Sequence, residues 1–475
     1  MSTTSRRQFL RSASALSAAL AGTPLRTGAP LAMSLAGLGS LASLGARAAD
    51  SSGYKALVCL YMHGGNDSHN WVVPIDATGY AQYAAVRREL AIPTSRLLPI
   101  GCSTQASGRA FGMVQELAAL RERYEAGTAA VVANVGPLLR PITKAEFGAG
   151  SALPSKLFSH NDQASTWQSM MPEGARSGWG GRMADILMAA NQYPTFTSVS
   201  ANGNAVFLAG GQVTQYQVGL EGPVSMKALG RSTLFDSTTA SSVLRRSLGA
   251  SGGNPFQDEY ARVASRSADS AATLQTALAS VSVAPIPATS ITLGSGAVVT
   301  LNNDSLARQL RVVARMIAAG QGMGMRRQVF MVSMGGFDTH GNQMRDHPSL
   351  TRRVSLSADY FLSAVQALGL SDSVTLFTAS DFGRTLTTNG SGSDHGWGGH
   401  QIIAGGAVHG GEIRGRFPIT ALGTADDVGS GRLLPSTSVT QYAAQLGRWM
   451  GLTETELAMV LPNLGEFSTA PAWLA

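Results

Sequence analysis

Cysteine is nearly absent from this 475-residue chain, which contains only Cys59 and Cys102. Because these two residues form no C-x-x-C pair, zinc-finger sites built from several thiolates are excluded. Cys59 lies in the apolar run ALVCLYM, where we expect a buried free thiol. Charged residues make up 14% of the chain and aromatic residues 7%, against 44% hydrophobic residues and 55 glycines. This composition is typical of a folded, loop-rich protein rather than of a disordered one.

The N-terminal 48 residues lack the roughly 20 strongly apolar residues that a membrane-spanning helix needs. Two prolines and an arginine interrupt the only apolar stretch there: Pro24, Arg26 and Pro30. A twin arginine in SRRQFLR precedes this stretch, and the small residues of ARAAD after it fit cleavage behind Ala48 or Ala49. The pattern predicts a cleaved Tat signal peptide, which the Tat translocase reads on proteins exported already folded, and hence a periplasmic or secreted protein. A retained N-terminal tether is the alternative.

The mature chain carries almost no net positive charge. Residues 1–48 hold five arginines and no acidic residue, and subtracting these from the 36 basic residues leaves 31 against 29 acidic residues. The high isoelectric point, about 9.6, therefore belongs largely to the signal peptide. No large basic surface for nucleic acid is expected.

Apolar runs bounded by polar loops predict the buried strands of a parallel sheet, at residues 55–62, 129–136, 328–334 and 373–379. Helical patterns at residues 113–125, 303–319 and 350–368 alternate with them. We therefore predict a doubly wound, mostly parallel α/β sheet flanked by helices, in one domain of residues 49–475. Residues 193–300 contain no histidine and one long helical pattern, at 257–279, and are predicted to form an insertion or cap.

Histidine and aspartate gather where the predicted strands end. The sequences HGGNDSHN, GGFDTHGNQ and SDFGRT each follow a predicted strand directly, and SDHGWGGH and FSHNDQAS carry further members. Seven of the eight histidines lie in or beside these stretches. Ligands bind open α/β sheets beyond the carboxyl ends of the strands, and imidazole with carboxylate suits zinc, manganese or similar ions. The sequence therefore predicts a divalent-metal site at this edge.

Several of these residues also have purely structural explanations. Asp67 could cap a turn, while His63 and His69 could be hydrogen-bonded loop residues. Arg384 could bind an anionic group through its planar guanidinium or pair with a metal-binding aspartate. His347 and His409 are expected at the surface or in turns.

The motifs YMHGGNDSHN, FSHNDQ, GWGGRMAD, GGFDTHGNQ, SDFGRT and DHGWGGH resemble, in combination, the domain-of-unknown-function 1501 family of exported bacterial proteins, from about Tyr54 to the C-terminus. That family is similar to the alkaline phosphatase and sulfatase superfamily. The resemblance implies an alkaline phosphatase-like sheet with one or two divalent ions, zinc or manganese, at its C-terminal edge. It implies five metal ligands: Asp67, Asp338, His340, Asp381 and His395.

The chain departs from the superfamily pattern in three places. One residue separates Asp338 from His340, fewer than usual, and Phe382 stands where a paired histidine is expected. The nucleophile lacks a diagnostic setting; Ser159 is the first candidate, followed by Ser165 and Thr166.

The function expected from this resemblance is an exported metal-dependent hydrolase of a phosphate or sulfate ester, on a small molecule or a polymer. Ser159 would attack, His160 or His400 would assist proton transfer, and Arg384 would bind the ester anion. One alternative is a non-catalytic binding or assembly protein with a degenerate metal site. Another is a mononuclear hydrolase of a different bond, such as an amide.

Overall fold

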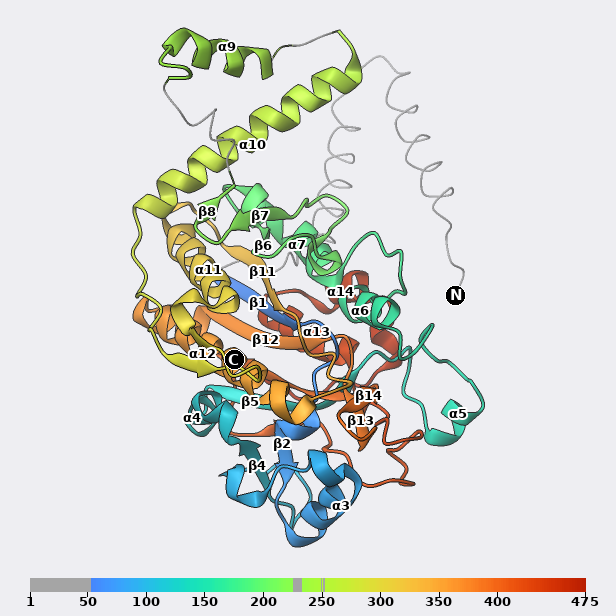
Figure 1. Ribbon diagram of the computed structural model, residues 1–475. Coiled ribbons are helices and arrows are strands. Elements are labelled where there is room, and N and C mark those ends of the chain that lie inside the picture. The colour runs from blue at the N-terminus through green and yellow to red at the C-terminus, as the bar shows by residue number, and fades with distance from the viewer. Residues whose placement is uncertain (1–52, 225–232, 249, 251–252) are drawn as a thin grey trace, which may run out of the picture. The chain divides into compact units, whose positions relative to one another are not determined.

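The computed structural model of the protein describes residues 53–224, 233–248, 250 and 253–475 (Figure 1). The predicted signal peptide lies outside the described residues, and Ala49–Ala475 forms one compact unit. Within the described part of the chain, no helix is long and apolar enough to cross a membrane. Cys59 and Cys102 are both free thiols, and Cys59 is buried as expected.

A large mixed sheet forms the centre of the fold, with the order β16-β5-β15-β12-β1-β11-β6-β7-β8. Its middle strands are parallel: β12 (Val374–Ser380), β1 (Lys55–Met62), β11 (Arg327–Met334) and β6 (Ser198–Ser200). β15 (Gly399–Ala404) runs antiparallel between β12 and β5 (Ala129–Gly136). The short strands at the edges are β16 (Ile413–Arg414), β7 (Tyr216–Gly219) and β8 (Gly222–Pro223), and β17 (Thr437–Ser438) also pairs with β5. The predicted α/β class, with a mostly parallel sheet flanked by helices, is confirmed.

Helices cover both faces of this sheet, which explains why its strands are apolar on both sides. Alternate residues of β1 belong to two separate hydrophobic cores: Ala56, Val58, Leu60 and Met62 to one, and Leu57, Cys59 and Tyr61 to the other. The first core packs against α4 (Ala118–Glu125), α11 (Ser305–Gly322) and α12 (Gln343–Ala367). The second packs against α7 (Trp179–Leu187), α13 (Val439–Trp449) and α14 (Glu454–Val460).

The predicted strands match β1, β5, β11 and β12 to within one residue. The helices match less closely. The pattern at residues 113–125 covers the end of strand β4 (Phe111–Val114) as well as α4, and α12 begins at Gln343, seven residues before the predicted start. Pro348 lies in the second turn of α12, where it removes a single intrahelical hydrogen bond, so the helix continues through it.

The middle region, predicted as an insertion or cap, contributes to the main sheet. β6 and β7 belong to residues 193–300; β6 pairs in parallel with β11, and β7 pairs in parallel with β6. The same region holds α9 (Thr238–Leu248), α10 (Pro255–Ala279) and a hairpin of β9 (Ser290–Thr292) and β10 (Val298–Thr300). In Figure 1, α9 and α10 lie beyond β7 and β8, on the side away from β13 and β14.

Smaller elements surround the C-terminal edge of the central strands. β2 (Val72–Pro74), β4 and β3 (Leu97–Ile100) form a second sheet beside α3 (Ala77–Arg87), and β13 (Arg384–Thr388) forms a hairpin with β14 (Ser393–His395). The 10-residue α6 (His160–Ser169) begins near this edge (Figure 1).

Candidate metal centre

The three central strands end in register, so the loops that follow them meet. Met62 of β1 pairs with Met334 of β11 and with Ser380 of β12. Gly64 and Gly65 allow this meeting: both have positive φ, and a Cβ on Gly64 would lie 2.4 Å from the Asp338 nitrogen. A Cβ on Gly65 would lie 2.3 Å from the Phe382 ring. Only glycine lets the first loop approach the other two so closely.

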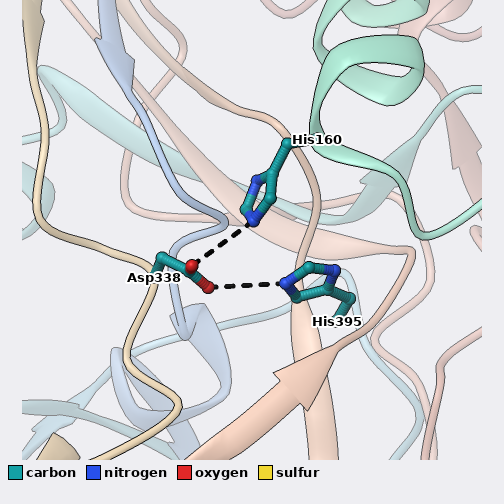
Figure 2. Close-up of side chains that lie close together, drawn as sticks. All are labelled: His160, Asp338 and His395. Atoms are coloured by element: carbon teal, nitrogen blue, oxygen red, sulfur yellow. Dashed lines mark ion pairs between the residues drawn. The ribbon is translucent and has the colours of Figure 1, made fainter.

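Three imidazoles converge on the carboxylate of Asp338, and Figure 2 shows two of them, those of His160 and His395. His160 Nε2 lies 3.5 Å from Asp338 Oδ2, and His395 Nε2 lies 3.4 Å from Asp338 Oδ1. His340 Nε2 lies 3.1 Å from the same Oδ1 and 2.8 Å from His395 Nε2. His160 comes from the start of α6, Asp338 and His340 from the loop after β11, and His395 from β14.

The other ring nitrogen of each histidine has an oxygen partner. His160 Nδ1 lies 2.8 Å from Asp381 Oδ2, and His340 Nδ1 lies 3.1 Å from Asp394 Oδ1. His395 Nδ1 lies 2.7 Å from the carbonyl oxygen of Phe158, which can only accept. With each Nδ1–H donating, the three Nε2 atoms face Asp338, and the 2.8 Å between His340 Nε2 and His395 Nε2 requires a shared proton or a bound cation there.

This arrangement fits a divalent cation. His160 Nε2 is buried and has no hydrogen-bond partner among the described residues. Ligand atoms of His160, Asp338 and His395 lie within 4.8 Å of one another. Their separations of 3.4 and 3.5 Å are close to the ~3.3 Å between neighbouring ligands of a tetrahedral zinc ion with bonds of about 2.0–2.1 Å. The residues present therefore form a possible His/Asp metal site.

Arg384 holds the carboxylate of Asp338 in place. Its Nη1 donates to Asp338 Oδ1 at 2.8 Å and to the Gly64 carbonyl at 3.2 Å, and its Nη2 donates to the Ser393 carbonyl. Partial burial acts to raise the pKa of Asp338, but the hydrogen bond and positive charge of Arg384 outweigh it and lower that pKa. Asp338 is therefore held as a carboxylate, the form that binds a cation.

The pKa values of His160 and His395 are shifted in opposite directions. The hydrogen bond to Asp381 raises the pKa of His160, whereas burial lowers the pKa of His395. Asp381 is itself fixed by the backbone N–H of Gly64, which donates to its Oδ2 at 2.9 Å. In the structure Asp381 thus contacts His160 rather than Asp338.

The Phe158 carbonyl reaches His395 because Phe158 adopts a left-handed backbone conformation, with φ of 71°. Such a conformation is uncommon for a bulky residue and costs roughly 1–3 kcal/mol. The Gln163 side chain of α6 stabilises it by accepting a hydrogen bond from the Phe158 N–H. Strain at this position is what aims the carbonyl at the histidine.

Asp67 does not lie in this cluster. It is fully buried and forms an ion pair with Arg87 at the end of α3, and it accepts a hydrogen bond from Gln343 at the start of α12. Burial acts to raise the pKa of Asp67, but the charge of Arg87 outweighs it and lowers that pKa. The structure therefore separates the predicted ligands. It brings Asp338, His340 and His395 together, whereas Asp67 is paired with the buried guanidinium of Arg87.

His400 also lies among buried groups rather than at the cluster. Its side chain is stacked on Phe417, with ring centroids 4.4 Å apart, and its Nδ1 accepts from the Asn134 N–H at 3.1 Å. His69 and His347 are buried as well; burial lowers the pKa of each to about 4. The expectation that His347 lies at the surface or in a turn is wrong, because it lies in α12 and its Nε2 bonds Asn66 Oδ1 inside the protein at 2.9 Å.

Ser159 directly precedes His160 and occupies the N-cap position of α6. Its Oγ donates to Asp162 Oδ2 at 3.0 Å. Ser165 and Thr166, the other candidate nucleophiles, bond carbonyl oxygens of Pro172 and Asp162. Ser159 is thus the one of the three whose hydroxyl adjoins a carboxylate.

Sequence reasoning missed the partners of the imidazoles and the place of His160. Asp394 was visible next to His395 in SDHG but was not assigned a role, and the carbonyl of Phe158 has no sequence signature. The sequence predicts proton transfer for His160, yet its Nε2 points at Asp338, as that of His395 does (Figure 2). The rule for open α/β sheets concerns residues that follow strands, and His160 instead lies at the start of helix α6.

Several solved structures are similar to this chain at low identity. The lipoteichoic acid synthase LtaP from Listeria monocytogenes has a TM-score of 0.37 and 5% identity, covering 88% of this chain and 76% of its own. Ps i-CgsB in complex with k-i-k-neocarrahexaose has a TM-score of 0.34 and 9% identity, covering 85% and 74%. A 2-O GAG sulfatase has a TM-score of 0.30 and 10% identity, covering 88% and 76%. Similarities at these TM-scores carry no inference about the site.

No protein with curated annotation matches the sequence. A family model does match, over residues 54–462, and its description is "Protein of unknown function (DUF1501)". This span contains every residue of the candidate metal site and of the sheet. The chain therefore belongs to the DUF1501 family, as its strand-end motifs indicated.

Proposed function

We propose that the protein is an exported, metal-dependent hydrolase of a phosphate or sulfate ester. One observation carries the proposal: three Nε2 atoms converge on the Asp338 carboxylate, and each ring is fixed through its Nδ1. Such carboxylate–histidine and carbonyl–histidine pairs are typical of rings that bind metals. His160, Asp338, His340 and His395 would hold the ion, zinc or manganese.

A single ion is favoured over two. The Phe382 ring packs against His160 and His395, with centroids 4.8 and 4.6 Å away. This ring occupies the sequence position that the superfamily resemblance gives to a second histidine ligand. A phenyl ring offers no lone pair, and it excludes water from one side of the cluster.

The other side of the cluster is open to a substrate. The side chains of Asp338 and His340 are 47% and 45% exposed. A bound divalent ion would polarise an ester oxygen and lower the pKa of an attacking group. Arg384 keeps Asp338 oriented, while Asp381 and Asp394 keep His160 and His340 in the tautomer that leaves Nε2 free. Ser159, beside Asp162, is the proposed nucleophile.

The proposal also covers the location of the protein. The twin-arginine segment and the near-neutral mature chain support Tat-dependent export to the periplasm or beyond, without a role in nucleic-acid binding. The partners would then be the translocase during export and an ester substrate afterwards.

The test is the metal content of the exported protein, measured by elemental analysis for the wild type and three variants: His160→Ala, Asp338→Ala and His395→Ala. His409→Ala, at an exposed histidine, is the matched control. We expect about one equivalent of zinc or manganese in the wild type and the control, and loss of the ion in the other three.

A panel of phosphate and sulfate esters then tests the reaction. Hydrolysis that requires the ion and disappears in the same three variants supports the proposal. An ion bound without turnover of any ester would instead favour the non-catalytic binding or assembly protein. No ion in the folded wild-type protein would refute the metal centre.

A further inference from the structure

A cationic side chain beside the metal site could neutralise the remaining charge of a phosphate or sulfate ester, and Arg384 is not free to do so. The side chain of Arg384 is 0% exposed, and both terminal nitrogens donate inward, to Asp338 and to the carbonyls of Gly64 and Ser393. The guanidinium is therefore committed to holding the carboxylate. Of the two explanations that the sequence left open for this residue, the pairing with a metal-binding aspartate is the one its contacts favour.

Arg432 has the opposite arrangement. Its Nε donates to the carbonyl oxygen of His395 at 3.0 Å, and its guanidinium lies over the Phe158 ring, 4.7 Å from the centroid. Both contacts are with residues of the metal centre: His395 points its Nε2 at Asp338, and Phe158 holds the His395 ring. Arg432 is thus attached to the cluster through the backbone of one of its ligands.

The terminal nitrogens of Arg432 remain available. Among the described residues, neither Nη1 nor Nη2 has a hydrogen-bond or ion-pair partner, and neither is a buried atom. Two other arginines form ion pairs with acidic side chains: Arg416 with Asp426, and Arg140 with Glu146. Lys156, on the loop before Phe158, has its Nζ 3.8 Å from Asp162 Oδ2. A planar fork of four free N–H donors is the group that suits a tetrahedral oxyanion.

The loop that carries Arg432 is rigidly held. Asp427 accepts hydrogen bonds from the backbone N–H groups of Gly429 and Gly431, at 2.8 and 2.9 Å. The carbonyl of Gly431 in turn accepts from the Leu386 N–H at 2.9 Å, which attaches the loop to β13. The guanidinium is therefore preorganised, with its Nε and its aromatic support already in place, so little side-chain entropy is lost when an anion binds.

We propose that Arg432 binds the tetrahedral oxyanion of the substrate beside the metal centre. This inference rests on the proposed ester hydrolase and names the residue that makes it select an anionic ester. A sulfate or phosphate ester bound at the candidate metal site would present its charged oxygens to the Arg432 fork as a second contact. An uncharged carboxylic ester would lack the second contact.

The experiment measures binding of the anion itself. Inorganic sulfate and inorganic phosphate are titrated separately by calorimetry into the mature protein, with and without metal, for the wild type, Arg432→Ala and Arg432→Lys. Arg352→Ala, at an exposed position of α12, is the matched control for loss of a positive charge. Metal content and melting temperature are recorded for every variant.

We expect Arg432→Ala to weaken binding of the preferred anion by about tenfold to a hundredfold, the range that loss of a charge-assisted hydrogen bond gives. Arg432→Lys should recover part of this loss, because it keeps the charge without the fork. The control should bind as the wild type does, and metal content should not change. In hydrolysis, Arg432→Ala should raise KM for the preferred phosphate or sulfate ester.

Equal anion binding by the wild type and Arg432→Ala would overturn the inference, and so would a wild type that binds neither anion. The two proposals fail separately. If the wild type contains metal but binds neither anion, the proposed role of Arg432 is refuted and the proposed metal site stands. If the wild type contains no metal, the proposed function is refuted. The anion titration of the metal-free protein then still tests whether Arg432 binds an oxyanion. Stronger binding of sulfate or of phosphate identifies the oxyanion.

Discussion

Replacing Asp67 by asparagine separates a structural role of this residue from a metal-binding one. The side chains of Asp67 and Arg87 are both 0% exposed and form an ion pair. In Asp67→Asn the guanidinium stays buried, bonded to the Thr385 carbonyl at 3.0 Å but without an opposite charge. Breaking a buried pair on one side costs about 3–5 kcal/mol, because the remaining charge is left uncompensated.

This cost converts to a modest change in melting temperature. With an unfolding entropy of about 2.1 cal/mol/K per residue over roughly 420 residues, about 0.9 kcal/mol corresponds to one degree. We therefore expect Asp67→Asn to melt about 3–6 °C below the wild type. The metal content should stay at the wild-type value, since Asp67 lies outside the cluster around Asp338.

Differential scanning calorimetry and elemental analysis on the same preparation are the measurements. Asp346→Asn, which removes the acid of an exposed ion pair with Arg345, is the control and should melt close to the wild type. The reasoning is refuted if Asp67→Asn loses its metal while its melting temperature is unchanged, because Asp67 would then be a ligand that leaves Arg87 in order to bind the ion.

Three further outcomes follow from the same structure. Asp381→Asn removes the charge that orients His160, so affinity for the metal should fall about tenfold to a hundredfold, as competition with a chelator would measure. Chelation should lower the melting temperature of the wild type but not of His160→Ala, because an ion at a hundred times its dissociation constant adds about 2.7 kcal/mol to the folded state. His69 and His347 are neutral when buried, with pKa values of about 4 against 6.5 when unfolded. Stability present above about pH 6.5 should therefore be lost as the pH falls toward 4, by up to about 3 kcal/mol for each, in urea titrations at stepped pH; a flat profile would contradict their burial as neutral rings.

The sheet could be predicted from sequence because its physical signal is local. Strands buried on both faces read as continuous apolar runs, and β1, β5, β11 and β12 were found in this way. The short strands β6 and β7 were not predicted, because they have only three and four residues and contain no continuous apolar run. Their place in the sheet depends on β11, more than 100 residues further along the chain.

The residues of the candidate metal site could be predicted from sequence where they lie close to strand ends. Asp338 and His340 follow β11 directly, and His395 belongs to a glycine-rich loop after β12, so the rule for open sheets places them together. The ion pair of Asp67 with Arg87 could not be predicted, because Arg87 belongs to a separate helix and no sequence pattern connects the two residues. Which of several acids binds a metal and which binds an arginine is decided by tertiary packing.

The three segments of the metal centre are far apart in the chain. His160 and Asp338 are 178 positions apart, and Asp338 and His395 are 57 apart. An ion held by all three would act as a cross-link that closes two long loops in a protein whose two cysteines are free. Such closures restrict the unfolded chain and slow its escape from the native state. The lifetime of the folded protein in the presence of a protease would then depend on how slowly the ion dissociates.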